Sequence, residues 1–302
     1  MREKNATLVH RPIIILGAAR SGTKLLRSII NASAHVSAVP YDVNYIWQFG
    51  NEYFDHDALP KEAATKDICM FIRAQLLKYS SSNEMTRIVE KTVSNALRIP
   101  FVNAVVPDAQ YIFIVRDGRD VVESAMRCWQ QSPEIGYMLQ KLRTYPWRHC
   151  MSYAVRVGLG LVAQRFGMGV SNHSWGPRYP GIDHDLRTLD LATICAKQWQ
   201  ATVSQYESDK GVIPAASLLE IRYEDLVSQP EYTALQIGQY LQLSDAKRIV
   251  DFAKEKTSKN FVGRSKQMEQ SAYRKAIAII EPTLNRWGYL NTADLKKVSE
   301  SF

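Results

Sequence analysis

Residues 17–24, Gly-Ala-Ala-Arg-Ser-Gly-Thr-Lys, combine the residue types that bind phosphate-like anions. The glycines allow a tight turn, Ser21 and Thr23 carry hydroxyl donors, and Arg20 and Lys24 carry positive charge. A helix that starts in such a turn also presents unpaired backbone N–H groups and the positive end of its dipole. The segment therefore predicts a phosphate-binding loop. The alternative is a plain strand-to-helix turn whose cations are solvated.

The residues on either side of this loop have the patterns of a strand and a helix. Ile13–Leu16 is a short apolar run, which indicates a buried strand, and apolar side chains recur at helical spacing from Leu25 onward. The loop differs from a Walker A motif, because Gly22 is followed by Thr23-Lys24 and not by Lys-Ser or Lys-Thr. We therefore expect it to bind a phosphate-like group without Mg²⁺ held between the nucleotide and a loop hydroxyl.

A second segment repeats this layout nearly a hundred residues later in the chain. Tyr111–Val115 is the next apolar run, Arg116 follows it, and Asp117-Gly118 forms the turn into a helix expected from residue 119 or 120. Ser124 then lies about two turns into the segment's helical part. In an open parallel sheet, ligands bind beyond the carboxyl ends of the strands. Two strand ends that each carry an arginine and a helix start therefore predict a site for two separate phosphates.

The segments 17–26 and 111–126 resemble the two signatures of the PAPS-dependent sulfotransferases, among them the tyrosylprotein, type-three-like and bacterial members. These enzymes take a sulfuryl group from 3′-phosphoadenosine-5′-phosphosulfate (PAPS) and release 3′-phosphoadenosine-5′-phosphate (PAP). Three further segments match in the family's order, so the resemblance extends from Ile13 to about Trp287. They are Glu90-Lys91-Thr92 followed by Asn95-Ala96-Leu97-Arg98, then Ile221-Arg222-Tyr223-Glu224-Asp225-Leu226, and Val262-Gly263-Arg264-Ser265.

The resemblance implies which residues bind the nucleotide. Arg116 and Ser124 match the positions that hold the 3′-phosphate, and Tyr223 falls near the adenine pocket. Arg264 and Ser265 fall in a loop that the family closes over the nucleotide, with donors that suit either phosphate. The alternative role for Tyr223 is that of a core aromatic residue. For Arg264 and Ser265 the alternative is a solvated loop. The 5′-phosphosulfate end is assigned to the first loop, through Arg20, Ser21, Gly22, Thr23, Lys24 and Leu25.

Sulfuryl transfer resembles phosphoryl transfer, because charge grows on the leaving oxygen and a fixed cation stabilises it. The resemblance assigns this role to Lys91 and Arg20, with Lys24 as a third candidate. For Lys91 the alternative is a surface cation in an exposed pair with Glu90, which would contribute little energy. A hydroxyl acceptor also needs a base. Asp42 is the carboxylate nearest the position of the base in the family, although it is offset by one or two residues.

The assignment of the base has competitors. Asp42 is equally suited to a turn or a helix N-cap, where aspartate makes local hydrogen bonds. His35, Glu52 and His173 are the other candidates.

The alternation of strands and helices predicts an α/β fold, with a P-loop-NTPase-like parallel sheet flanked by helices, as in the sulfotransferase fold. We expect one domain over residues 1–302, a further strand at Ser217–Arg222, and helices at Glu231–Leu241 and Ser244–Lys256. Prolines and aromatic residues set residues 128–190 apart, which predicts a helical insertion on the acceptor side of the cleft. A mixed helical layer packed on the sheet is the alternative.

Composition limits the partners. The net charge of +8 favours a basic cleft for a multiply charged cofactor or an acidic polymer, and the lack of Lys/Arg blocks disfavours nucleic acid. The cysteines and histidines lack the spacings of a metal site, so we expect no metal requirement. With no apolar run of membrane-spanning length and a polar N-terminus, we expect a cytoplasmic enzyme with no integral membrane segment.

These observations together predict transfer of a sulfuryl group from PAPS to a hydroxyl acceptor, by in-line displacement. A saccharide or another small alcohol or phenol is the expected acceptor, and a homodimer is left open. Two alternatives remain: a nucleotide-dependent kinase or NTPase-like protein with the same loop architecture, and a non-catalytic PAP-binding module.

Overall fold

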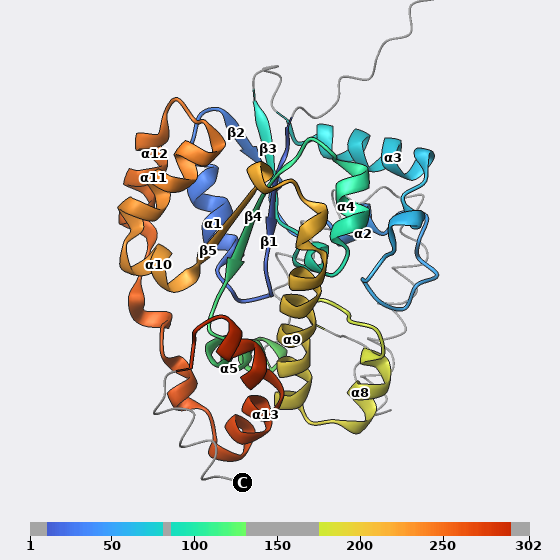
Figure 1. Ribbon diagram of the computed structural model, residues 1–302, viewed down its shortest axis with the longest axis vertical. Helices are drawn as coiled ribbons and strands as arrows, with labels where there is room; N and C mark the ends of the chain where they lie inside the picture. Colours follow the sequence, from blue (N-terminus) through green and yellow to red (C-terminus); the bar gives the residue numbers. More distant parts are fainter. Residues whose placement is uncertain (1–10, 81–85, 131–174, 291–302) are drawn as a thin grey trace, which may run out of the picture.

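A computed structural model describes residues 11–80, 86–130 and 175–290 of the 302-residue chain (Figure 1). Five parallel strands form one sheet in the order β2-β3-β1-β4-β5. The predicted α/β fold with a parallel sheet is therefore confirmed. The strands are β1 (Ile13–Leu16), β2 (Val36–Ala38), β3 (Arg87–Glu90), β4 (Gln110–Val115) and β5 (Leu218–Arg222).

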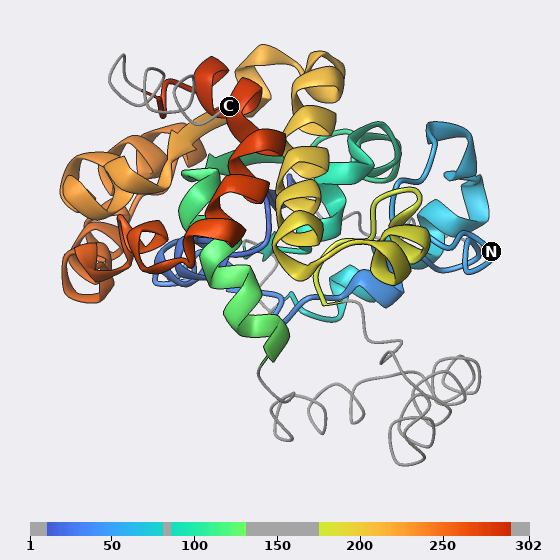
Figure 2. The same ribbon diagram turned by 90° about the horizontal axis from the view of Figure 1, so that it is seen from below.

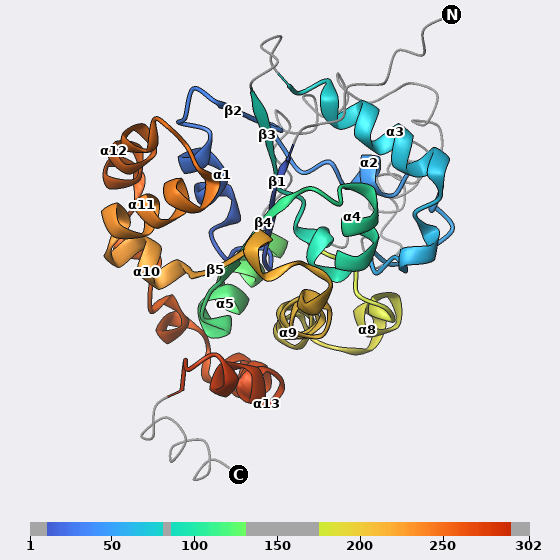
Figure 3. The same ribbon diagram turned by 45° about the horizontal axis from the view of Figure 1, so that its top comes forward.

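Helices cover both faces of the sheet, with α1, α10, α11 and α12 on one side and α2, α3 and α4 on the other (Figure 3). Side chains alternate between the two faces of a strand. Ile13 and Ile15 accordingly pack into the core under α1 and α10–α12, whereas Ile14 and Leu16 pack into the core on the opposite face. All four residues of β1 are buried because both faces are covered, which explains the unbroken apolar run.

The helices take the following bounds in chain order. They are α1 (Thr23–Ile30), α2 (Asn44–Trp47), α3 (Lys66–Leu77), α4 (Ile99–Val105), α5 (Gly118–Gln130), α8 (Ile182–Thr188), α9 (Leu191–Asp209), α10 (Tyr223–Ser228), α11 (Pro230–Leu241), α12 (Ala246–Lys256) and α13 (Gln270–Arg286). Short 3₁₀ turns occupy η1 (Lys61–Ala63), η2 (Val93–Leu97), η3 (Lys210–Val212), η4 (Ala215–Ser217), η5 (Lys259–Phe261) and η6 (Arg264–Gln267).

The predicted strands and helices agree with these bounds to within two residues. The helix expected from residue 119 or 120 begins at Gly118, where the backbone lies against the buried Trp199. A Cβ atom at Gly118 would lie 2.9 Å from the Trp199 ring. The glycine therefore allows α5 to start directly against α9, and α9 runs beside α13 (Figure 2).

The predicted insertion at 128–190 is described only in part. Residues 128–130 continue α5, and residues 175–190 form an irregular segment followed by α8. Residues 131–174 lie outside the described residues. The domain organisation and the acceptor-side role of this region stay predictions.

Candidate active site

The predicted site residues follow the carboxyl ends of the strands. Because the strands are parallel, these ends meet at one edge of the sheet, which is where open α/β sheets bind ligands. The sheet therefore gathers segments that are up to two hundred residues apart in the chain. Gly17 follows β1, Asp42 lies four residues after β2, Lys91 follows β3, Arg116 follows β4 and Tyr223 follows β5.

Two glycines give the first loop its close fit. A Cβ atom at Gly17 would lie 2.5 Å from the backbone oxygen of Ile114, so only glycine fits beside β4. Gly22 has a φ of 91° and packs so tightly on Tyr223 that a Cβ atom would lie 2.4 Å from that ring. Gly22 caps α1 without a side-chain hydrogen bond, and the first turn of α1 has no acidic residue. The first N–H groups of α1 are thus left for an anion.

The remaining predicted residues of this loop differ in exposure. Thr23 is buried on the first turn of α1, whereas Lys24 is exposed and Leu25 is partly buried. Ser21 is 1% exposed, and its hydroxyl has no hydrogen-bond partner among the described residues. An anion at the helix start would supply that partner.

Arg20 joins the first loop to the second one. Its backbone adopts a φ of 71°, a left-handed conformation that is uncommon for a residue other than glycine and often marks a functional site. Its Nε donates a hydrogen bond to Ser124 Oγ (2.9 Å), and its carbonyl oxygen accepts one from Arg116 Nη1 (3.0 Å). The two predicted anion-binding loops are therefore in direct contact.

Arg116 is the buried cation of the second loop, with 5% of its surface exposed. Its Nη2 donates to the carbonyl oxygen of Phe261 and lies 3.6 Å from Asp120 Oδ2. Its guanidinium group stacks over the Tyr223 ring at 4.4 Å, and Arg116 Nε has no partner among the described residues. A buried guanidinium with an unused donor fits an anionic ligand such as a phosphate.

The loop around residues 262–265 is fixed to α5 by its main chain. Asp120 Oδ2 accepts a hydrogen bond from Gly263 N (2.7 Å), and Asp120 Oδ1 accepts one from Ser265 N (2.9 Å). This brings the predicted Ser265 to the second loop. The guanidinium group of Arg264 lies over the Phe261 ring at 4.6 Å, so that side chain is turned toward its own loop.

The structure brings the predicted cation Lys91 and the predicted base Asp42 together. Lys91 Nζ lies 3.5 Å from Asp42 Oδ2, and their side chains are 13% and 19% exposed. The same carboxylate oxygen accepts a hydrogen bond from Val93 N at 3.2 Å. Asp42 Oδ1 has no hydrogen bond from the described residues.

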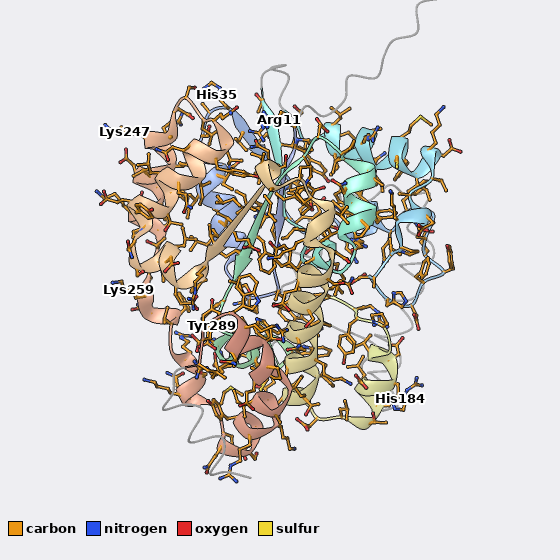
Figure 4. All side chains as sticks on the ribbon, viewed as in Figure 1. Arg11, His35, His184, Lys247, Lys259 and Tyr289 are labelled. Atoms are coloured by element: carbon orange, nitrogen blue, oxygen red, sulfur yellow. The ribbon has the colours of Figure 1, made fainter. Side chains whose placement is uncertain are left out.

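The other candidate bases are placed differently. His35 precedes β2, and its Nε2 lies 3.0 Å from Ser244 Oγ, at the amino edge of the sheet near Arg11 and far from Tyr289 (Figure 4). Glu52 is exposed in the segment after α2, and His173 lies outside the described residues. Of the candidates in the described ranges, Asp42 is the one paired with Lys91.

Two buried carboxylates in the site were not predicted from the sequence. Asp120 fixes the 262–265 loop, and its position one helical turn after Arg116 was the available signal. Glu90, at the end of β3, is fully buried and accepts hydrogen bonds from Thr92 Oγ1 and Asn95 Nδ2. Burial raises the pKa of Glu90 to about 7. A carboxylate at the end of an apolar strand was the signal for Glu90.

Comparison with known proteins supports a sulfotransferase relationship. The model of the "Sulfotransferase family" matches residues 12–157, which include the first loop, Lys91, Arg116 and Ser124. The resemblance seen in the sequence is therefore confirmed for this part of the chain. A "Putative protein-tyrosine sulfotransferase" from Caenorhabditis briggsae is 25% identical over 131 residues, or 41% of this chain and 45% of the relative. The chain thus spans about half the length of that curated relative.

Solved structures show the same fold at low sequence identity. Sulfotransferase STF9 from Mycobacterium avium superposes with a TM-score of 0.51 at 12% identity, covering 92% of this chain and 77% of the other. Sulfotransferase STF1 from Mycobacterium tuberculosis H37Rv superposes with a TM-score of 0.50 at 14% identity, and the match covers 90% of this chain and 77% of the other. In the described ranges, no helix has the length and apolar character needed to cross a membrane.

Proposed function

We propose that this protein is a PAPS-dependent sulfotransferase that transfers a sulfuryl group to a hydroxyl acceptor. The observation that carries the proposal is the contact between the two anion-binding loops, through Arg20, Ser124 and Arg116. A nucleotide with phosphates on both its 3′ and 5′ positions needs two adjacent anion sites on one protein surface. The family match over residues 12–157 covers both loops and supports the same assignment.

The donors of the site support a division of the nucleotide between the two loops. Residues 20–25, with the buried Ser21 hydroxyl and the start of α1, suit the 5′-phosphate end. Arg116 and Ser124 suit the 3′-phosphate, together with the adjacent Ser265. Tyr223 packs between Gly22 and Arg116, and this position suits contact with the adenosine between the two phosphates.

The catalytic roles are proposed from charge and from the resemblance to the sulfotransferases. PAPS supplies an activated sulfuryl group, and Lys91 and Arg20 stabilise the charge that develops on the leaving oxygen. Asp42, held by Val93 N and Lys91, accepts the acceptor's proton through its remaining oxygen. The acceptor hydroxyl would therefore enter beside the Lys91–Asp42 pair.

The acceptor is proposed to be a saccharide or another alcohol or phenol. Trp175 and Pro177 line a small apolar crevice together with Ala18 and Ala19 of the first loop. The crevice is too small to hold a ring, so a sugar or a phenol would contact Trp175 from outside it. The relative from Caenorhabditis briggsae is named for protein tyrosine, which makes a peptide phenol a specific candidate.

A nucleotide-dependent kinase or NTPase is the alternative activity. Such a protein needs a carboxylate for Mg²⁺ near the end of a strand beside the loop. Here Arg116 follows β4 beside the loop, and its cation favours an anionic ligand that needs no metal. The carboxylate at the end of β3, on the other side of β1, is Glu90, which is fully buried with both oxygens hydrogen-bonded to Thr92 and Asn95. A non-catalytic PAP-binding module would use Arg116 and Ser124 but would have no need of Lys91.

Transfer of labelled sulfate from PAPS to a panel of saccharides, phenols and tyrosine peptides tests the proposal, with and without EDTA. We expect transfer to at least one acceptor and no loss with EDTA, because the chain's cations supply the positive charge. Transfer that EDTA abolishes and Mg²⁺ restores, or phosphoryl transfer from ATP, would favour the kinase alternative. PAP binding without turnover on any acceptor would favour the binding module.

A further inference from the structure

Glu90 is a buried carboxylate beside the Lys91–Asp42 pair that the proposed chemistry does not use directly. It ends β3, is fully buried, and accepts hydrogen bonds on both oxygens. Thr92 Oγ1 donates to Oε1, and Asn95 Nδ2 donates to Oε2 at 3.0 Å. Two chains of hydrogen bonds lead from these donors toward the segment that carries Asp42.

The first chain passes through Thr92. Because its hydroxyl hydrogen is donated to Glu90, its oxygen accepts the backbone N–H of Val43 at 3.1 Å. The next backbone N–H, from Val93, donates in the opposite direction to Asp42 Oδ2 at 3.2 Å. Residues 92–93 and 42–43 are thus held together by two reciprocal hydrogen bonds.

The second chain passes through Asn95 and Arg98. Asn95 Oδ1 accepts from Arg98 Nε at 2.9 Å, and Arg98 Nη2 donates to Asn44 Oδ1. Asn44 Nδ2 then donates to Asp57 Oδ1 at 2.8 Å. The three consecutive residues from 42 to 44 are therefore all tied to the segment 92–98.

The direction of every hydrogen bond in the second chain is set by its members. An ionised carboxylate only accepts hydrogen bonds, and a guanidinium group only donates them. The two amides must therefore turn their NH₂ groups toward Glu90 and Asp57 and their oxygens toward Arg98. A reversed amide would place two donors face to face inside the protein, where an unmatched polar group costs about 1–3 kcal/mol.

We propose that Glu90 is a positioning residue that fixes Asp42 relative to Lys91 by accepting the hydrogen bonds with which both chains begin. The expected effect on kcat rests on the proposed function. The positioning of Asp42 by Glu90 does not depend on it. Three other charged groups, Asp42, Lys91 and Arg98, lie close enough to Glu90 to interact with it electrostatically. Because burial raises the pKa of Glu90, the test is made at pH 8, where the carboxylate is mainly ionised.

Glu90→Gln is the decisive variant, because it keeps the shape of the side chain and replaces one acceptor with a donor. We expect kcat to fall about 10- to 100-fold, as is typical when the support of a reacting group is lost, with the Kd for PAP unchanged within about twofold. A second change, Asn95→Asp, should restore much of kcat, because the carboxylate it introduces would accept from both the new amide and Arg98. Glu220→Gln on β5 is the matched control and should keep wild-type kcat.

Hydrogen exchange provides a readout that does not depend on turnover. In Glu90→Gln we expect the amide protons of Val43 and Val93 to exchange at least about tenfold faster, because both hydrogen bonds lose their alignment. If wild-type protein transfers no sulfuryl group, the proposed function fails while this measurement still tests the positioning. Unchanged exchange at both amides would overturn the inference, whatever the kinetics show.

Two variants of Thr92 keep the test valid if Glu90→Gln does not fold. Thr92→Val keeps the shape but removes the hydroxyl, whereas Thr92→Ser keeps the hydroxyl. We expect the valine variant to lose kcat and amide protection at Val43, and the serine variant to regain most of both. Equal kcat in the two variants would contradict the proposal, as would a loss of kcat in Glu90→Gln that is matched by an equal loss of PAP affinity.

Discussion

Replacing Arg116 with alanine should remove the protein's ability to recognise a 3′-phosphate. The Arg116 guanidinium is buried, stacks on Tyr223 and contacts two backbone carbonyl groups. It also lies 3.6 Å from the carboxylate of Asp120. Arg116→Ala removes a buried charge-assisted contact and leaves the negative charge of Asp120 beside the proposed phosphate position.

The size of the effect follows from these contacts. Truncating one partner of a buried charge-assisted pair costs about 2–4 kcal/mol, or roughly 30- to 700-fold in Kd. We expect the upper part of this range, because Asp120 would then repel the ligand instead of balancing Arg116. Calorimetric titrations with PAP and with adenosine 5′-phosphate measure the effect. The wild-type protein should prefer PAP strongly, and the variant should bind the two nucleotides almost equally.

Arg127→Ala is the matched control for this experiment. Arg127 lies on α5, the helix that begins two residues after Arg116, and its side chain is 44% exposed and pairs with Glu123. We expect it to bind PAP within about twofold of wild type, since its ion-pair partner is Glu123 and not a residue assigned to the nucleotide. The assignment of Arg116 and Ser124 to the 3′-phosphate would be refuted if wild-type protein bound both nucleotides equally, or if Arg116→Ala kept the wild-type preference for PAP.

Three further predictions concern Lys91, Asp42 and Glu90. Lys91→Ala should lower the single-turnover rate about 10²- to 10³-fold while PAP binding by calorimetry changes little, because charge on the leaving oxygen is greater in the transition state than in bound PAPS. Asp42→Asn should abolish the rise of kcat with pH that ionisation of a base produces, measured as a pH–rate profile with saturating PAPS. Glu90 holds a proton more tightly in the folded state, with a pKa of about 7 against an ordinary 4.5. From pH 4.5 to 7, the free energy of unfolding should therefore fall by on the order of 3 kcal/mol in wild type relative to Glu90→Gln, as measured by urea denaturation.

Each of these predictions has a contradicting result. A wild-type rate in Lys91→Ala would make Lys91 a surface cation without a catalytic role. An unchanged pH–rate profile in Asp42→Asn would move the base to another residue. Parallel stability curves for wild type and Glu90→Gln between pH 4.5 and 7 would show that Glu90 does not titrate in this range.

The strands and loops of the site were predictable because their signals are local. The apolar run at Ile13–Leu16 and the turn that follows it are visible within ten residues, and the strand was predicted with the bounds it has in the structure. The strand before Arg116 is also signalled locally, and it begins one residue earlier than the predicted Tyr111–Val115. Parallel pairing then implies that the two loops share an edge of the sheet.

The contacts between the segments were not predictable, because they depend on side chains far apart in the chain. Asp42 and Lys91 were each assigned a role, but nothing in the sequence showed that they meet. The role of Asp120 depends on its contact with the 262–265 loop, and the sequence does not show this contact because the two segments are far apart in the chain. The helix α9 was not among the predicted elements, although its buried Ala192, Cys195, Trp199 and Tyr206 recur at helical spacing. Polar Gln198 and Thr202 lie on the same buried side and weaken the apolar pattern.

The attachment of the 262–265 loop through its main chain has a consequence for protein engineering. Asp120 accepts hydrogen bonds from the backbone N–H groups of Gly263 and Ser265, so the attachment of the loop does not depend on the side chains at positions 264 and 266. Those two side chains can be randomised in a library while the loop keeps its place on α5. Selection among such variants could change which nucleotide the protein prefers, for example a donor with another base or another anionic group, without rebuilding the backbone around it.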